Sequence, residues 1–213
     1  MTDADSSEES ETDAAVETAG EDGRDDERRT ADRSEAIDRS LGVGVVTIST
    51  ARSLDTDAAG EAIVSALENV DHEVTTREHI GSDHDRVQAT VSRMIDRDDV
   101  DVVVTGGATS VEPDDVTIEA VDPLLEKTLS TFEDLFTTLA YEAVGTRAVA
   151  ARTTAGVTEG TVVFCLPGDE DAARLGVEEL VLPEMGYLVA LTREEIDEDR
   201  WAVEETESDA GGE

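Results

Sequence analysis

Apolar residues along the chain cluster into short runs that polar and acidic segments separate. Three runs rich in β-branched residues predict strands, over residues 41–50, 70–80 and 100–104. Between them, apolar residues recur at helical spacing: Ile63, Val64 and Leu67 after the first run, and Val87, Val91, Met94 and Ile95 after the second. The order strand, helix, strand, helix, strand predicts a three-layer α/β fold, with helices on both faces of a mostly parallel sheet.

Acidic and hydroxyl residues stand where the expected helices begin. Asp57 precedes the first helix, and Ser82 or Asp83 precedes the second. Such side chains accept a hydrogen bond from a free N–H group of the first helical turn. By the same rule, we expect Asp114 or Asp115 to cap a third helix that runs to about Lys127.

The remaining apolar runs predict two further strands and two further helices. The strands are expected over residues 148–157 and 161–166, joined by a tight turn. One helix is centred on residues 132–140, and the other runs over residues 171–182. We expect Pro183 to end the second helix, because proline cannot donate a helical hydrogen bond.

The turn after the third strand carries the strongest candidate chemistry. Thr105, Gly106 and Gly107 begin the turn, and Thr109 and Ser110 follow. Small residues let the backbone approach a ligand closely, and free N–H groups and hydroxyls can face anionic oxygens. A strand, a glycine turn and a helix start in this order predict an anion site. The alternative is an ordinary connection between a strand and a helix.

Several other loops are expected at the same rim of the sheet as this turn. In a parallel α/β sheet, ligands bind outside the carboxyl ends of the strands. Residues 49–53, 82–83 and 105–115 all follow expected strands. Pro167, Gly168 and Asp169 form another tight turn after a strand. We therefore predict that these loops converge.

The large excess of acidic residues limits which binding partners and which cellular location we expect. The formal net charge is -38, and Lys127 is the only lysine. Because no basic face is visible, neither nucleic acid nor an anionic membrane is an expected partner. Carboxylates spread over the helices are typical of a surface adapted to concentrated salt. With no apolar span and no signal peptide in sight, we expect the cytoplasm of a halophile.

Composition divides the chain into a folded domain with two tails. Residues 1–40 are acidic and poor in branched aliphatics, which predicts a disordered tail, with an acidic interaction arm as the alternative. Residues 41–191 form the expected domain, and residues 192–213 form an acidic C-terminal tail. Cys165 lies inside an apolar run, so we expect a buried hydrophobic residue rather than a catalytic thiol.

Four motifs in series give the chain a family resemblance. They are the glycine turn at residues 105–110 with Pro-Asp-Asp-Val-Thr at 113–117, Tyr-Glu-Ala-Val-Gly-Thr at 141–146, Arg-Thr-Thr-Ala-Gly-Val at 152–157, and Leu-Pro-Gly at 166–168. In order and approximate spacing, the chain resembles the MoaB/Mog family of molybdenum cofactor biosynthesis proteins from residue 41 to about residue 191.

This resemblance implies a molybdopterin-binding fold, a trimer or hexamer, and a reaction. Active members of the family transfer AMP from Mg-ATP to molybdopterin before metal insertion, so Mg²⁺ is the implied cofactor, and ATP and molybdopterin are the implied substrates. The family pattern makes Asp115 the leading catalytic or metal-binding carboxylate and Asp83 a second acid. It assigns binding of the pterin phosphate and the nucleotide to the two turns, at Thr105, Gly106, Gly107, Thr109, Ser110, Pro167 and Gly168.

The glycine turn also departs from the family pattern, which is usually Thr-Gly-Gly-Thr-Gly. Ala108 and Ser110 replace two glycines, and a side chain at positive φ costs about 1 kcal/mol or more. Asp114 stands where many relatives carry arginine. These changes leave two alternatives open: a non-catalytic molybdopterin-binding or scaffold protein, and a nucleotide or anion binder outside cofactor synthesis.

Overall fold

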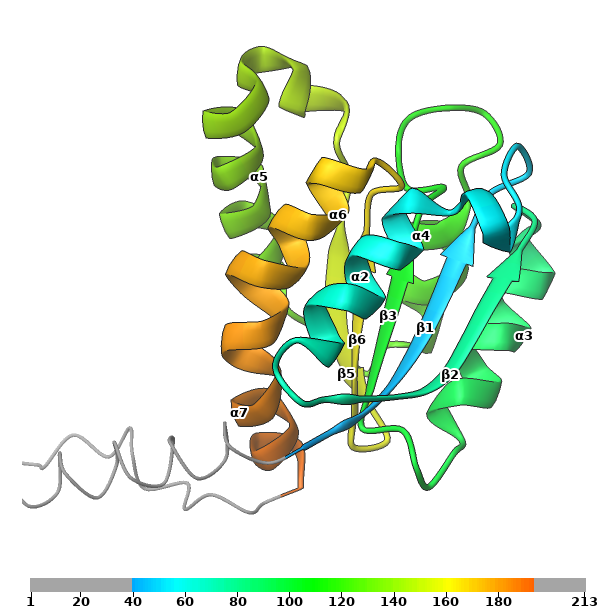
Figure 1. Ribbon diagram of the computed structural model, residues 1–213, viewed down its shortest axis with the longest axis vertical. Helices are drawn as coiled ribbons and strands as arrows, with labels where there is room; N and C mark the ends of the chain where they lie inside the picture. The colour runs from blue at the N-terminus through cyan, green and yellow to red at the C-terminus, as the bar shows by residue number, and fades with distance from the viewer. Residues whose placement is uncertain (1–39, 194–213) are drawn as a thin grey trace, which may run out of the picture.

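A computed structural model describes residues 40–193 of the protein (Figure 1). The predicted tails lie almost entirely outside the described residues. Six strands form one sheet in the order β2-β1-β3-β6-β5-β4. The strands are β1 (Gly42–Ile48), β2 (Glu73–Ile80), β3 (Val102–Gly106), β4 (Lys127–Thr128), β5 (Thr154–Thr158) and β6 (Thr161–Leu166).

The sheet is mostly parallel, as predicted. Strands β2, β1, β3 and β6 run parallel, and β3 lies between β1 and β6. Strand β5 pairs with β6 in antiparallel orientation, and β4 pairs with β5 in antiparallel orientation at the edge of the sheet. A two-residue turn joins β5 to β6, with Glu159 at φ 50° and Gly160 at φ 79°. Two successive positive φ values match the right-handed twist of a hairpin.

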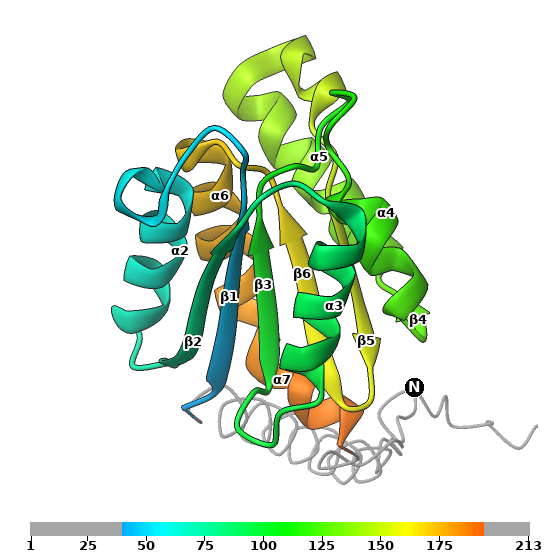
Figure 2. The same cartoon turned by 90° about the vertical axis from the view of Figure 1, so that its right-hand side faces the viewer.

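Helices cover both faces of the sheet, which confirms the three-layer prediction (Figures 1 and 2). The α-helices are α2 (Ala58–Glu68), α3 (His84–Ile95), α4 (Thr117–Val121), α5 (Ser130–Val144), α6 (Glu170–Gly176) and α7 (Leu182–Thr192). Shorter turns are η1 (Leu54–Thr56), η2 (Asp122–Leu124), η3 (Gly145–Ala150) and the π-helical η4 (Val177–Val181). No helix within residues 40–193 is long and apolar enough to cross a membrane.

Two apolar layers, one on each face, hold the sheet and helices together. Helices α2, α5, α6 and α7 pack on one face, where Ile63, Phe136 and Phe164 are buried. Helices α3 and α4 pack on the other, where Val87 and Cys165 are buried. Burial raises the pKa of the Cys165 thiol to about 12, so the thiol stays uncharged at neutral pH. Cys165 is thus the buried hydrophobic residue that the sequence predicts.

The structure confirms two predicted helix caps and contradicts the third. Asp57 accepts a hydrogen bond from the Gly60 N–H at 3.0 Å, and Asp83 accepts one from the Arg86 N–H at 2.9 Å. The caps predicted at Asp114 or Asp115 are wrong, because the residue before α4 is Val116 and no side chain caps this helix.

Contacts with the glycine turn, rather than a cap, hold the start of α4. The Thr117 N–H donates to the Ala108 carbonyl at 2.9 Å, and its hydroxyl donates to the Gly107 carbonyl at 2.7 Å. The helix also ends earlier than predicted, at Val121 instead of about Lys127. Pro123 lacks the N–H that would continue the helix, and a short 3-10 turn follows.

Two further element boundaries differ from the sequence prediction. Pro183 does not end a helix, because η4 precedes it and Pro183 occupies the first turn of α7. The chain stays helical up to this proline through η4, in which the Leu182 N–H donates to the Val177 carbonyl. The strand predicted from residue 148 begins only at Thr154, since residues 145–150 form η3. The strand β5 is correspondingly shorter than predicted.

Candidate functional site

The loops after β1, β3 and β6 meet at the carboxyl rim of the sheet. The Gly107 N–H donates to the Leu166 carbonyl at 2.9 Å. A Cβ added to Gly107 would lie 2.4 Å from the Ile48 carbonyl oxygen, and one added to Gly168 would lie 2.9 Å from the Gly107 Cα. The two predicted turns are therefore in direct backbone contact, because both positions are glycine.

The glycine turn presents a row of amide groups. Gly107 has φ 105° and Ala108 has φ 51°, so the backbone turns sharply after the buried end of β3. Among residues 40–193, no acceptor receives a hydrogen bond from the amides of Ala108, Thr109 or Ser110. Successive N–H groups in such a turn form a concavity that suits an anion. The anion site at these amides remains a prediction.

The side chains of the turn do less than the sequence suggests. The Ser110 hydroxyl donates to the Ala150 carbonyl at 3.1 Å, and Arg152 donates to the Ser110 carbonyl at 3.3 Å. Thr105 and Gly106, predicted to begin the turn, lie inside β3, where Thr105 is fully buried, and Thr109 is 3% exposed. The Ser110 hydroxyl is therefore bonded within the chain and the two threonine side chains are buried, so the backbone amides are the turn's main groups for a ligand.

The two predicted acids lie on neighbouring loops. Asp83 caps α3. Asp115 lies in a turn in which its own N–H donates to the Glu112 carbonyl. The Ser82 hydroxyl donates to the Asp114 carbonyl, which ties the two loops together. In the described part of the chain, no group of three or more His, Cys, Asp or Glu side chains is arranged to hold a metal. Any divalent cation here would need further oxygens from its ligand.

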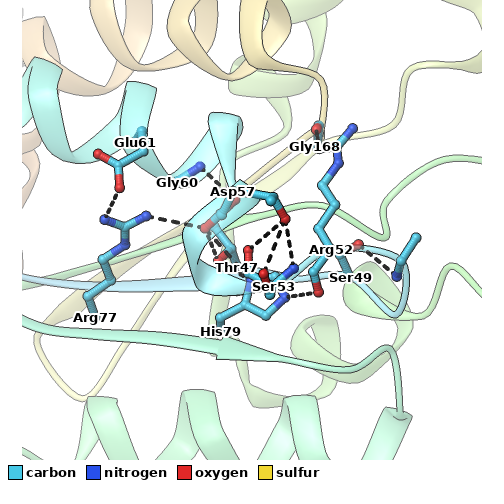
Figure 3. A network of polar contacts seen from close by, with 12 residues as sticks. Thr47, Ser49, Arg52, Ser53, Asp57, Gly60, Glu61, Arg77, His79 and Gly168 are labelled. Carbon is cyan, nitrogen blue, oxygen red and sulfur yellow. Dashed lines mark hydrogen bonds and ion pairs between the residues drawn. The ribbon is translucent and has the colours of Figure 1, made fainter.

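A buried carboxylate network at the end of β1 was not predicted from the sequence (Figure 3). Asp57 is 3% exposed, although the sequence indicated only a helix cap. Its carboxylate also accepts a hydrogen bond from the Thr47 hydroxyl at 2.5 Å and faces Arg77 Nη2 at 3.4 Å. Buried charge is costly unless it is paired, and these partners satisfy it. The available signal was a polar residue, Thr47, inside an apolar strand.

His79 extends this network to the rim loop. Its Nδ1 lies 3.0 Å from the Thr47 hydroxyl, and its Nε2 lies 3.0 Å from the Arg52 carbonyl. The Thr47 hydroxyl has one proton, which it donates to Asp57. The Thr47 oxygen can then accept a hydrogen bond from an Nδ1–H of His79, and an Nε2–H of His79 can donate to the Arg52 carbonyl. His79 Nδ1 lies 3.7 Å from Asp57 Oδ2. The network thereby fixes the backbone of the loop after β1.

The Arg52 side chain crosses from this loop to the turn after β6. Its Nη1 donates to the Gly168 carbonyl at 2.8 Å (Figure 3). The sequence predicts residues 49–53 at the rim but indicates no role for Arg52. Asp169, next to Gly168, caps α6 by accepting from the Ala172 N–H at 3.2 Å. The Asp169 carboxylate therefore stabilises the start of α6.

A cavity of about 410 Å³ lies between α2 and α6. Residues of both helices line it, among them Glu61, Asn69 and Arg174. None of the predicted site residues lines this cavity. The candidate site is therefore defined by the converging loops and their amides.

The rim loops converge at the carboxyl edge of the mostly parallel sheet of an α/β protein, and comparison with known proteins gives the family. Residues 44–187 match the family described as a probable molybdopterin binding domain. Molybdenum cofactor biosynthesis protein B of Bacillus cereus is 39% identical over 145 residues, which cover 68% of this chain and 86% of the relative. The chain belongs to the MoaB family of molybdopterin-binding-domain proteins.

Solved structures agree with this assignment. A crystal structure of molybdenum cofactor biosynthesis protein B has a TM-score of 0.71 at 36% identity and covers 73% of this chain and 98% of its own. The tungsten cofactor synthesizing protein MoaB from Pyrococcus furiosus has a TM-score of 0.65 at 32% identity, with coverage of 73% and 98%. Both likenesses span nearly three quarters of this chain.

Proposed function

We propose that this protein transfers AMP from Mg-ATP to molybdopterin. The observation that carries the proposal is the backbone contact between Gly107 and Gly168, which sets three unpaired amides beside the turn after β6. In nucleotidyl transfer, an oxygen of the acceptor bonds to the α-phosphorus as pyrophosphate leaves. Donors that hold the phosphates in line supply much of the rate.

Each part of the site has a role in this proposal. The amides of Ala108, Thr109 and Ser110 bind phosphate oxygens, because N–H groups are sufficient donors for an anion. Asp83 and Asp115 offer carboxylate oxygens, which are the donors that Mg²⁺ prefers. The cation, when bound, neutralises charge on the phosphates. Pro167 and Gly168 shape the opposite wall, since a side chain at Gly168 would meet Gly107.

The experiment is an adenylylation assay with purified protein in high salt, molybdopterin and Mg-ATP. We expect adenylylated molybdopterin from the wild type and at least a hundredfold lower rate, about 2.7 kcal/mol, from Asp115→Ala. Asp98→Ala is the matched control, because Asp98 is an exposed acid before β3, at the opposite end of the sheet. No product from wild-type protein that binds both substrates would refute the proposal.

A non-catalytic molybdopterin-binding or scaffold role is the second candidate. The altered glycine turn favours it, because Ala108 is held at φ 51°, where a side chain is strained. This role predicts retained molybdopterin binding without product. It also predicts that Asp115→Ala behaves as the wild type does in every assay.

We also propose that the chain assembles as a trimer or hexamer. Helix α5 and the following η3 expose apolar side chains: Leu135 is 50% exposed, Tyr141 59%, Val144 56% and Val149 89%. An exposed apolar patch of this kind is typical of a protein interface. Light scattering should give the mass of an oligomer for the wild type and a smaller species for Val149→Asp. Val70→Asp, at a residue 49% exposed near β2, is the control.

The acidic surface supports a last part of the proposal, that the protein works in concentrated salt inside the cytoplasm. Mutual repulsion of carboxylates falls as salt screens it. The unfolding temperature should therefore rise steeply between low and molar KCl. A flat dependence on KCl would contradict this part.

A further inference from the structure

Arg52 differs from most arginines of the described chain in having no carboxylate partner. Six arginines between residues 40 and 193 form ion pairs: Arg77, Arg93, Arg97, Arg152, Arg174 and Arg193. Within the same range, Arg52 forms none, and its one hydrogen bond is to the Gly168 carbonyl. Arg86 and Arg147 also form no ion pair within residues 40–193, but of these three arginines only Arg52 has a side chain that hydrogen-bonds a rim loop.

The unpaired charge lies where the rim loops meet. Arg52 reaches from the loop after β1 to Gly168, and Gly168 contacts Gly107. The amides of the glycine turn follow directly after Gly107. A guanidinium carries five N–H donors, so a single bond to a neutral carbonyl leaves most of them available. Arg52 is thus a positive charge with spare donors beside the amide row.

The network behind Arg52 anchors its backbone and does not involve its side chain. His79 Nε2 contacts the Arg52 carbonyl at 3.0 Å, and the same ring contacts Thr47, which is bound to Asp57. Asp57 also caps α2, so the loop is tied to both β2 and α2. The side chain itself is exposed. Only its bond to Gly168 must be given up when a stronger acceptor arrives.

We propose that Arg52 binds a phosphate oxygen of the site's ligand and that His79 is its positioning residue. The inference rests on the proposed function, because it concerns the same site and a phosphorylated ligand. A phosphate oxygen is a stronger acceptor than a carbonyl, and arginine can bind it with two parallel hydrogen bonds. The Arg52 charge also offsets the repulsion between an anion and the acidic surface.

The direct test uses inorganic pyrophosphate, the leaving group of nucleotidyl transfer, with calorimetry at fixed KCl. Arg52→Gln should raise the Kd for pyrophosphate about tenfold or more, and Arg52→Lys should lose less. Arg93→Gln removes one charge at a residue that pairs with Glu78 and should change the Kd by less than about twofold. Equal affinities of Arg52→Gln and the wild type would overturn the inference. So would a wild-type chain that does not bind pyrophosphate.

The positioning role of His79 needs a readout that general destabilisation does not give. His79→Gln should weaken pyrophosphate binding in the wild-type background and have little further effect in Arg52→Gln. Coupled losses of this kind show that His79 acts through Arg52, whereas additive losses would contradict that role. Thr47→Ser keeps the hydroxyl and should bind as the wild type does. Unfolding curves establish that every variant is folded at the assay temperature.

This test separates the inference from the proposed reaction. Pyrophosphate contains neither adenosine nor pterin, so its binding does not require that the protein transfer AMP. A wild type that binds pyrophosphate through Arg52 but forms no adenylylated product refutes the reaction alone. Product formation with unchanged pyrophosphate affinity in Arg52→Gln refutes only the role of Arg52.

Discussion

Gly107 and Gly168 touch backbone to backbone where β3 and β6 end, and neither position has room for a side chain. A Cβ on Gly168 would lie 2.9 Å from the Gly107 Cα, and a Cβ on Gly107 would lie 2.4 Å from the Ile48 carbonyl oxygen. The contact joins two turns of the rim whose glycines are 61 positions apart in the sequence. It is the basis of the first prediction.

Gly107→Ala should destabilise the fold by about 3 kcal/mol or more, because the new Cβ meets backbone atoms and the residue has φ 105°. Gly160→Ala is the matched control, since Gly160 also has positive φ but open space around it. It should lose only about 1 kcal/mol. Urea unfolding of the two variants measures the difference, and equal losses would show that the close contact does not matter.

Ala108→Gly should stabilise the protein by about 0.5 to 1 kcal/mol. Ala108 is held at φ 51°, and relief of this strain exceeds the extra chain entropy of glycine. Ala151→Gly is the control, because Ala151 has φ -77°, where alanine is unstrained, and it should lose stability. A loss of stability in Ala108→Gly as large as that in Ala151→Gly would contradict this account.

Asp57→Ala should cost about 3 kcal/mol of folding free energy, well above an ordinary cap. The substitution removes the α2 cap, leaves the buried Thr47 hydroxyl without its acceptor and removes a partner of Arg77. Asp169→Ala also removes a cap, but Asp169 is exposed and should lose about 1 kcal/mol. Thermal unfolding of both variants gives the comparison. Losses of similar size would mean that the network adds no stability.

Acid should destabilise the fold in part through His72. Its Nδ1 accepts the Leu41 N–H at 3.2 Å, which requires an unprotonated nitrogen, and burial lowers its pKa below the ordinary 6.5 despite the opposing charge of Asp71. The unfolded chain therefore binds this proton first. The contribution is fully present above pH 6.5, declines as the pH falls below it and is lost below the folded-state pKa.

The measurement is the free energy of unfolding against pH for the wild type and His72→Gln. The variant should show a smaller loss of stability on the acid side of pH 6.5. His84→Gln is the control of opposite sign, because a hydrogen bond to Asp85 raises the pKa of the exposed His84. The contribution of His84 is present at low pH and fades as the pH rises. An unchanged acid slope in His72→Gln would contradict the prediction.

The prediction from the sequence was most accurate where neighbours along the chain decide the structure. Asp57 and Asp83 cap their helices because a cap needs only the residue and the next turn. It was wrong at Asp115 because the start of α4 is held by carbonyls of Gly107 and Ala108, about ten residues away. It was also wrong at Pro183, where the preceding π-helical turn leads into a new first turn.

By itself, the sequence determined five of the six strands, the main helices, the layered fold and the loops that gather at one rim, because hydrophobic periodicity and the order of elements along the chain are local properties. It did not predict β4, which is only two residues long and has no such periodicity. Only the tertiary structure decided that Thr47, Asp57 and His79 form one network and that Arg52 reaches Gly168. Thr47 and His79 are 32 residues apart, and Arg52 and Gly168 are 116 apart. Contacts at such separations depend on how strands pair and helices pack, which no local pattern records.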